Sequence, residues 1–329
     1  MYPSLTGCFM HYSAISTLES HFIDPGYNKE YRIKPFTMDI PDELIKLNGN
    51  FLAPLNRSGY YFDKAYPKKR IVVHYTAGQL RSDIQALSRD KYHVSVAFVI
   101  ARDGRIYQLF SSRYWSGHIG KGIGNIQTGN AEDKATIGIE LSNYGWLTRR
   151  GDNLETCYSR AISSNGKVSG QDVYCHISEK EAFQELKTPF RDKIYFASYT
   201  PKQYDSLIVL LRYLTKVYGI KREFPDESVR YKAFREVVSF NGIVTHVNYR
   251  ESGKWDIGPA FDWDQVISGV KAESYENRFI PSPMIKMRGE EAYSEEPEDF
   301  FPTPAPEEKE NDSYVETSRN PEEFIPDNF

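Results

Sequence analysis

Three ionisable side chains fall at positions in the sequence where such groups are uncommon. His74 ends the apolar run of KKRIVVHYTAG, His246 lies within GIVTHV, and Glu140 occupies the middle of ATIGIELSNYG. Each run is typical of a buried strand, in which an ionisable group without a partner is costly. A shared metal ion would satisfy them, and so would an ordinary hydrogen-bond network. The spacing of these residues does not distinguish a metal site from a hydrogen-bond network, because the histidines are far apart and Asp256 follows the second by ten residues.

Strands and helices are expected around these side chains. The run from Lys68 ends in a Thr-Ala-Gly turn and predicts a strand buried on both faces, followed by a short helix over residues 81–88. Two apolar runs around Asp103 and Gly104 predict a hairpin. In the strand that carries Glu140, alternation places Ile137, Ile139 and Leu141 on one face and Gly138, Glu140 and Ser142 on the other.

The later elements complete an α/β pattern. Thr200 and Pro201 are typical of a helix start, leucines recur at helical spacing, and Gly219 predicts the end. A last strand over 242–247 leads into a loop and a short terminal helix. We therefore predict a central mixed sheet, mostly buried, with helices on both faces.

The 329 residues favour one large domain with appendages. We predict an N-terminal extension over residues 1–65, whose role is not readable, and a main domain over 66–270. Residues 144–199 are polar, lack strong periodicity and are interpreted as an insertion. Residues 271–329 form a tail rich in Pro and Glu that is predicted to be disordered. The tail holds sixteen acidic and six basic side chains, which leaves a net charge of +6 on the rest.

Other features of the sequence narrow the class of protein. Cys8, Cys157 and Cys175 are few and far apart, so reduced thiols are expected. No secretory signal and no apolar run near the roughly 20 residues of a membrane span is visible. We expect synthesis in the cytoplasm, no membrane insertion and no nucleic-acid partner. The aromatic residues of the tail, and the N-terminal extension, are compatible with docking on a partner protein.

A series of motifs resembles a known family. In chain order they are VVHYTAG, VSVAFVIARDGRIYQLF, GHIGKG, TIGIELSNYG, YTPKQYDSL and THVNYRESGKWDIGPAFDW. They are similar to the pattern of the type 2 N-acetylmuramoyl-L-alanine amidases, which include a cytoplasmic muropeptide-recycling enzyme, phage lysins and animal peptidoglycan recognition proteins. The resemblance covers roughly residues 68–267. Its last motif is the most specific.

The resemblance implies a role for each matched residue. His74, His246 and Asp256 match the zinc ligands, with one Zn²⁺ per chain and a fourth position open to water. Glu140 matches the general base, and Lys254 matches the residue that stabilises the oxyanion. The implied fold has a zinc-floored groove beside the sheet.

Two departures from the family pattern bear on which branch of the family the chain resembles and on which residues lie at the substrate cleft. Members that lack the glutamate use a tyrosine where this chain has Val96 and Ala97, so the sequence resembles the glutamate-using branch, like the anhydro-muropeptide amidase of wall recycling. His118 and Trp115 match residues near the substrate cleft, although the residues between them differ from the usual motif. We expect both to bind substrate, with a surface-loop histidine as the alternative for His118.

The resemblance implies hydrolysis of the amide between N-acetylmuramic acid and L-alanine, with peptidoglycan or a muropeptide as substrate. We expect a wall-degrading lysin or delivered effector, which reaches the cell wall after lysis or through a secretion system. A cytoplasmic recycling amidase is the alternative for delivery and location. A binding module that keeps the fold and loses the metal is the alternative for activity.

Overall fold

The structure is a computed structural model of the whole chain. It describes residues 33–36, 51–54, 59–89, 91–120, 130–160, 166 and 170–273. Contacts divide the chain into two units, residues 1–280 and 281–329, and every described residue belongs to the first. The predicted tail beyond residue 273 and most of the predicted N-terminal extension lie outside the described residues, so those domain boundaries stay predictions.

A five-stranded mixed sheet forms the centre of the first unit. Its strand order is β12 (Gly242–Thr245), β3 (Arg70–Tyr75), β6 (Thr136–Leu141), β4 (Phe98–Ile100) and β5 (Ile106–Gln108). The first four strands are parallel and β5 is antiparallel to β4. The predicted hairpin around Gly104 is therefore confirmed. β3 is buried on both faces, because Ile71 and Val73 belong to one hydrophobic cluster and Val72 belongs to another.

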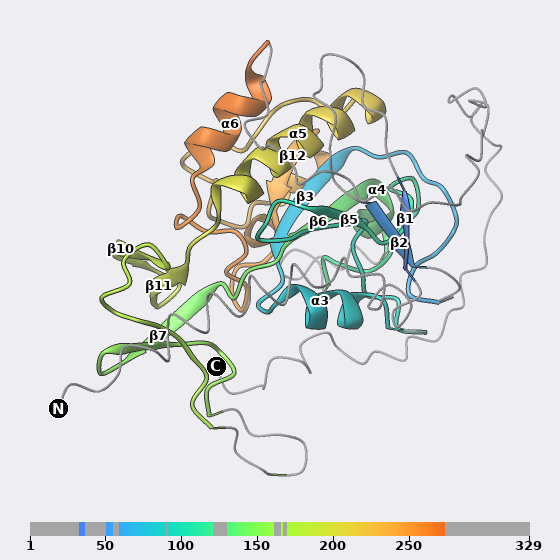
Figure 1. Cartoon of the computed structure of the whole chain (residues 1–329). Coiled ribbons are helices and arrows are strands. Elements are labelled where there is room, and N and C mark those ends of the chain that lie inside the picture. The colour runs from blue at the N-terminus through green and yellow to red at the C-terminus, as the bar shows by residue number, and fades with distance from the viewer. Residues whose placement is uncertain are drawn as a thin grey trace. The chain divides into compact units, whose positions relative to one another are not determined.

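Helices flank this sheet as the sequence predicts. They are α3 (Leu80–Leu87), α5 (Pro201–Tyr218) and α6 (Trp263–Lys271). In Figure 1, α5 and α6 lie together on one side of the central sheet and α3 lies on the other. Thr200 and Gln203 form a capping box at the start of α5, and Gly219 adopts φ 63° directly after its end. The mixed α/β fold with flanking helices is confirmed.

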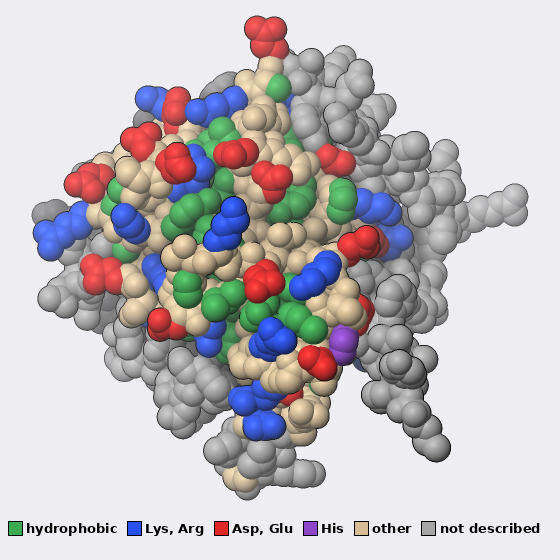
Figure 2. Space-filling model, turned by 90° about the vertical axis from the view of Figure 1, so that its left-hand side faces the viewer, with side chains coloured by type: hydrophobic (Ala, Val, Ile, Leu, Met, Phe, Trp, Pro, Cys, Tyr) green, Lys and Arg blue, Asp and Glu red, His purple; other side chains and the backbone are tan. Residues whose placement is uncertain are grey.

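The predicted insertion forms a second sheet. Its strand order is β10 (Phe183–Phe190), β11 (Lys193–Ala197), β7 (Trp146–Arg150), β8 (Asn153–Glu155) and β9 (Val173–His176), and all neighbours are antiparallel. The sequence indicates no regular elements here, because the strands are short and most of β10 is exposed and polar. Leu147, Leu154, Tyr174 and Phe183 give this sheet a small core of its own. Acidic and basic side chains are interspersed on this side of the molecule (Figure 2).

The remaining elements are short. A strand pair joins β1 (Ile33–Phe36) to β2 (Phe51–Pro54), α4 covers Ala131–Ala135, and the 3-10 turns η1 and η2 cover Arg235–Ser239 and His246–Asn248. One prediction is wrong in detail, because His246 does not lie inside the last strand. β12 ends at Thr245, whose side chain caps η2, so His246 starts a turn at the edge of the sheet. Within the described part of the chain, no helix has the length and apolar character needed to cross a membrane.

Candidate metal centre

Three side-chain atoms from distant parts of the chain converge where β3 and β12 end. The Nδ1 atoms of His74 and His246 lie 3.1 Å apart. The Oδ2 atom of Asp256 lies 3.0 Å from the first nitrogen and 2.9 Å from the second. All three residues are buried, with exposed fractions of 2%, 5% and 6%. The three predicted ligands therefore form one compact group.

The local structure explains how these side chains meet. β3 and β12 run parallel and their register pairs Val73 with Thr245, so His74 and His246, the next residue in each case, emerge at the same edge of the sheet. Thr245 and Asn248 fix the turn that carries His246. The backbone N–H of Val247 donates to the carbonyl of Asp256 over 2.9 Å, which closes the intervening loop onto the turn.

The arrangement of the three atoms suits a small divalent cation. The three atoms lie about 3 Å from one another, which is close to the separation of ligand atoms that bind one zinc ion at about 2.0–2.2 Å. Two imidazole nitrogens and one carboxylate oxygen are a ligand set that transition metals such as zinc prefer. His74, His246 and Asp256 can therefore hold a metal ion.

Burial and mutual contact shift the pKa values of this group. Burial lowers the pKa of His246 to about 4, against the opposing effect of Asp256. Burial alone would raise the pKa of Asp256, but the two histidines outweigh it and hold that pKa well below its usual range. Neutral imidazole and ionised carboxylate are the forms that bind metals.

Each histidine has a second partner at its other ring nitrogen. The Nε2 atom of His74 lies 3.0 Å from the Nδ1 atom of His118, whose own Nε2 lies 2.9 Å from the hydroxyl of Thr136. The Nε2 atom of His246 lies 2.9 Å from the carbonyl oxygen of Ile119. A carbonyl only accepts, so Nε2 of His246 carries the proton and Nδ1 presents its lone pair. Such second partners orient metal-binding histidines.

Asp133 holds the segment that supplies both of these partners. Its carboxylate accepts the backbone N–H of His118 over 2.9 Å and that of Ile119 over 3.1 Å. Asp133 lies in α4 directly before β6, so one short helix supports the outer contacts of both candidate ligands. The sequence analysis missed Asp133, because nothing in its local pattern distinguishes it from a surface carboxylate.

Glu140 and His74 lie side by side on the sheet. They are partners in the parallel register of β3 and β6, so their side chains leave the sheet on the same face. The Oε2 atom of Glu140 is buried and has no hydrogen-bond partner among the described residues. Burial raises the pKa of Glu140 well above its usual range, the charge of Asp256 raises it further, and Lys254 opposes both effects. The Lys254 side chain thus lies within electrostatic range of Glu140 and of His246.

His118 and Trp115, the two residues expected to bind substrate, both make contacts within the protein. His118 has a side chain that is 5% exposed and contacts His74 at the ring nitrogen opposite the converging atoms. Trp115 is buried and stacks on Phe62 with ring centroids 4.1 Å apart. In these contacts His118 supports His74 and Trp115 packs against Phe62. Contact of either residue with substrate stays a prediction.

A family profile described as N-acetylmuramoyl-L-alanine amidase matches residues 64–259, which is more than half of the chain. The chain belongs to the type 2 N-acetylmuramoyl-L-alanine amidase family. This confirms the resemblance in the motifs. The matched range contains the three candidate ligands, Glu140, Lys254 and the whole inserted sheet. No curated protein matches the chain.

Solved amidase structures are similar to this chain at low identity. AmiD from E. coli, solved in complex with a muropeptide substrate, is 21% identical over 67% of this chain and 63% of its own, with a TM-score of 0.38. AmpD is 16% identical over 71% of this chain and 99% of its own, with a TM-score of 0.36. PlyL is 14% identical over 68% and 96%, with a TM-score of 0.37. The chain thus spans less than two thirds of the AmiD chain.

The amidase centre also depends on close packing at Gly138. A Cβ atom there would lie 2.7 Å from the Val96 side chain and 3.1 Å from Nδ1 of His118. We expect Gly138→Ala to lower the free energy of unfolding by about 1–3 kcal/mol, because neighbours must shift to admit the methyl group. Urea unfolding measures this change.

The matched control is Gly170→Ala, since among the described residues no atom lies within 4 Å of a Cβ built there. It should change stability by no more than about 0.5 kcal/mol. Equal losses in the two variants would contradict the packing at Gly138.

Proposed function

We propose that this amidase is zinc-dependent and that His74, His246 and Asp256 hold one Zn²⁺ per chain. The observation that carries the proposal is the triangle of two imidazole nitrogens and one carboxylate oxygen, with sides near 3 Å. Three protein ligands leave one tetrahedral position open, as in catalytic zinc sites. The buried, unpartnered oxygen of Glu140 beside this group also fits a site built to receive further components.

The proposed reaction is hydrolysis of the amide between N-acetylmuramic acid and L-alanine. Zinc would supply Lewis-acid polarisation and would lower the pKa of water to about 7. Glu140 takes a proton from the attacking water through its free carboxylate oxygen and passes it to the leaving amine of alanine. The raised pKa of Glu140 suits both steps, because the group must accept and then donate a proton near neutral pH.

Lys254 supplies a positive charge where negative charge develops. The electrostatic effect of its ammonium group on both Glu140 and His246 supports this role. There it would stabilise the carbonyl oxygen of the amide as that oxygen becomes negative. A pure binding module needs neither a free carboxylate nor this lysine, so the five residues together support hydrolysis over recognition alone.

We further propose that the natural substrate is polymeric peptidoglycan, with the enzyme acting as a wall-degrading lysin or delivered effector. The N-terminal extension and the acidic tail are additions that hydrolysis of a small soluble muropeptide does not require. Comparison of intact sacculi with soluble anhydro-muropeptides as substrates tests this. Faster turnover of the soluble substrate at equal amide concentration would favour a recycling enzyme instead.

His118→Ala is expected to weaken zinc binding by about 10- to 100-fold while leaving all three ligands in place. The variant removes the partner of His74 Nε2, so the ring loses its fixed orientation. Competition with a chromogenic chelator measures the dissociation constant. His176→Ala is the control, because the hydrogen bonds of that ring in the described part of the chain are with nearby Ser178, just after β9. Unchanged affinity in His118→Ala would remove the supporting role of His118.

A further inference from the structure

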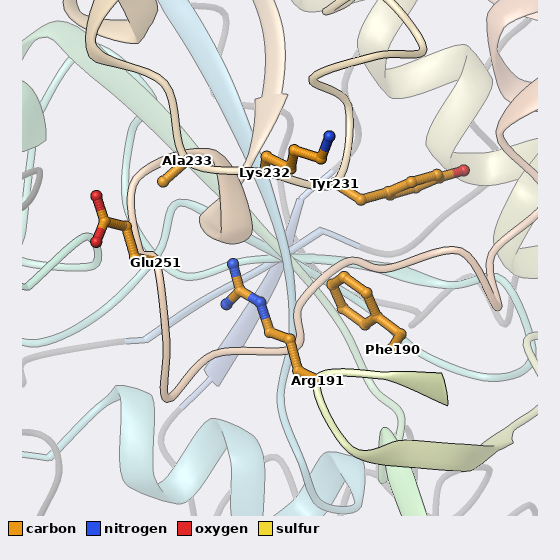
Figure 3. A pocket seen from close by; sticks show the side chains of 6 residues that line it. All are labelled: Phe190, Arg191, Tyr231, Lys232, Ala233 and Glu251. Atoms are coloured by element: carbon orange, nitrogen blue, oxygen red, sulfur yellow. The ribbon is translucent and has the colours of Figure 1, made fainter. Parts of the chain in front are cut away.

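The turn between β10 and β11 points toward the loop that carries the metal site. Arg191 and Asp192 connect the two strands, and both have positive φ values, 46° and 65°. Two such residues make a tight hairpin turn, although neither is the glycine or asparagine that this backbone favours. Figure 3 shows Arg191 leaving this turn toward the loop of Glu251. An open pocket of about 540 Å³ borders the turn and is lined by Phe190, Arg191, Tyr231, Lys232, Ala233 and Glu251.

Arg191 binds the backbone of the loop between His246 and Asp256. Its guanidinium group donates to the carbonyl oxygens of Lys254, of Arg250 over 2.6 Å and of Val247 over 3.5 Å. In return, the indole N–H of Trp255 donates to the carbonyl of Arg191 over 2.9 Å. Together these bonds hold the backbone carbonyl of Lys254 and the side chain of Trp255, the next residue.

Ring packing from the inserted sheet reinforces this contact. The rings of Trp146 in β7 and Trp255 lie 5.6 Å apart, and the Lys193 ammonium lies 3.8 Å from the Trp146 ring centroid. Phe190 approaches the loop so closely that a Cβ at Gly258 would lie 2.5 Å from its ring. A hydrophobic cluster therefore surrounds the residue directly before Asp256.

The contacted loop needs such support because it lacks regular structure. Between the end of η2 and Asp256 it contains an exposed stretch that includes Glu251, Ser252 and Gly253. Ordering each residue of such a stretch costs about 1–2 kcal/mol of backbone entropy. Lys254 and Asp256 both lie on this loop, so their positions relative to His74 and Glu140 depend on what holds its backbone.

We propose that the inserted sheet is a positioning element of the metal centre, in which Arg191 fixes the backbone that presents Lys254 and Asp256. This inference rests on the proposed zinc site. None of the hydrogen bonds of Arg191 goes to the side chain of His74, His246, Asp256 or Glu140, so it acts through the loop and is a positioning residue. The insertion is accordingly part of the amidase machinery rather than a separate appendage.

The test compares metal binding in Arg191→Ala and in Arg149→Ala. Arg149 also belongs to the inserted sheet and donates to a backbone carbonyl, but it is exposed and its acceptor is Gly151, two residues away in the adjoining turn. Arg191→Ala should raise the zinc dissociation constant by about 10- to 100-fold, as loss of an outer contact does at other metal sites. It should also change the visible absorption spectrum of the Co²⁺-substituted protein, whereas Arg149→Ala should change neither.

If Arg191→Ala does not fold, two conservative variants test the positioning role of Arg191. Arg191→Lys keeps the charge but loses the planar fork, and Trp255→Phe keeps an aromatic ring but loses the indole donor. Each should raise the zinc dissociation constant. Unchanged zinc affinity and an unchanged Co²⁺ spectrum in the folded variants, with zinc bound by the parent protein, would overturn this inference alone. A parent protein that binds no zinc would overturn the proposed function and this inference together.

Discussion

His246→Ala is expected to abolish stoichiometric zinc binding and, with it, hydrolysis of the muramoyl–alanine amide. The variant removes one corner of the triangle and leaves two ligands, which is fewer than catalytic zinc sites use. His74→Ala and Asp256→Ala should behave in the same way. Enzymes accelerate reactions by about 10⁶-fold or more, and loss of the metal should remove most of that acceleration here. Elemental analysis after dialysis, together with product quantification, measures both losses.

Asp256→Asn separates the ligand role of Asp256 from its place in the fold. The amide keeps the shape of the side chain and a single acceptor oxygen but loses the negative charge, so zinc affinity should fall between that of the parent and that of Asp256→Ala. Stoichiometric zinc in all three alanine variants would show that the metal binds elsewhere. Circular dichroism identifies any variant that loses zinc because it has unfolded.

Glu140→Gln is expected to keep zinc and the fold while losing about 10²- to 10⁴-fold in turnover, the usual contribution of a general base. The amide is nearly isosteric with the carboxylate but cannot accept the proton of the attacking water. Because Oε2 of Glu140 has no hydrogen-bond partner among the described residues, the substitution breaks no bond at that atom. Steady-state kinetics should therefore place the loss in kcat, with little change in the free energy of unfolding.

Lys254→Ala is the matched control for this experiment. It removes charge stabilisation while leaving the Glu140 carboxylate in place, and it should also retain zinc. A Glu140→Gln protein that turns over at the parent rate with zinc bound would rule out Glu140 as the base. A variant that mainly loses stability would instead indicate that Glu140 is a structural residue of the sheet.

The sequence predicts the central sheet well because its signals are local. The β-branched run that ends at His74, the Asp-Gly turn at residues 103 and 104, and the Thr-Pro start of α5 each determine a short piece of backbone. Alternation also places Glu140 on the opposite face from Ile139, and in-register pairing of β3 with β6 then brings it beside His74. The candidate ligands were predicted from the family motifs, because their spacing in the sequence does not distinguish a metal site from a hydrogen-bond network.

The supporting contacts escape sequence reasoning because they join backbone atoms across long separations. Arg191 binds carbonyl oxygens some sixty residues away, and any residue type supplies a carbonyl. Asp133 likewise binds two backbone N–H groups. The inserted sheet was missed because most of β10 faces solvent and carries polar side chains, so burial leaves little periodicity to detect.

The most direct test is product analysis of an anhydro-muropeptide hydrolysed in ¹⁸O-labelled water by zinc-loaded and by chelator-stripped protein. We expect only the zinc-loaded protein to release a peptide with a free L-alanine amino terminus. One ¹⁸O atom should then be found in the lactyl carboxylate of the sugar and none in the peptide, because water attacks the lactyl carbonyl. Cleavage at another bond, equal turnover by the stripped protein, or no turnover by the zinc-loaded protein on either this substrate or sacculi would contradict it.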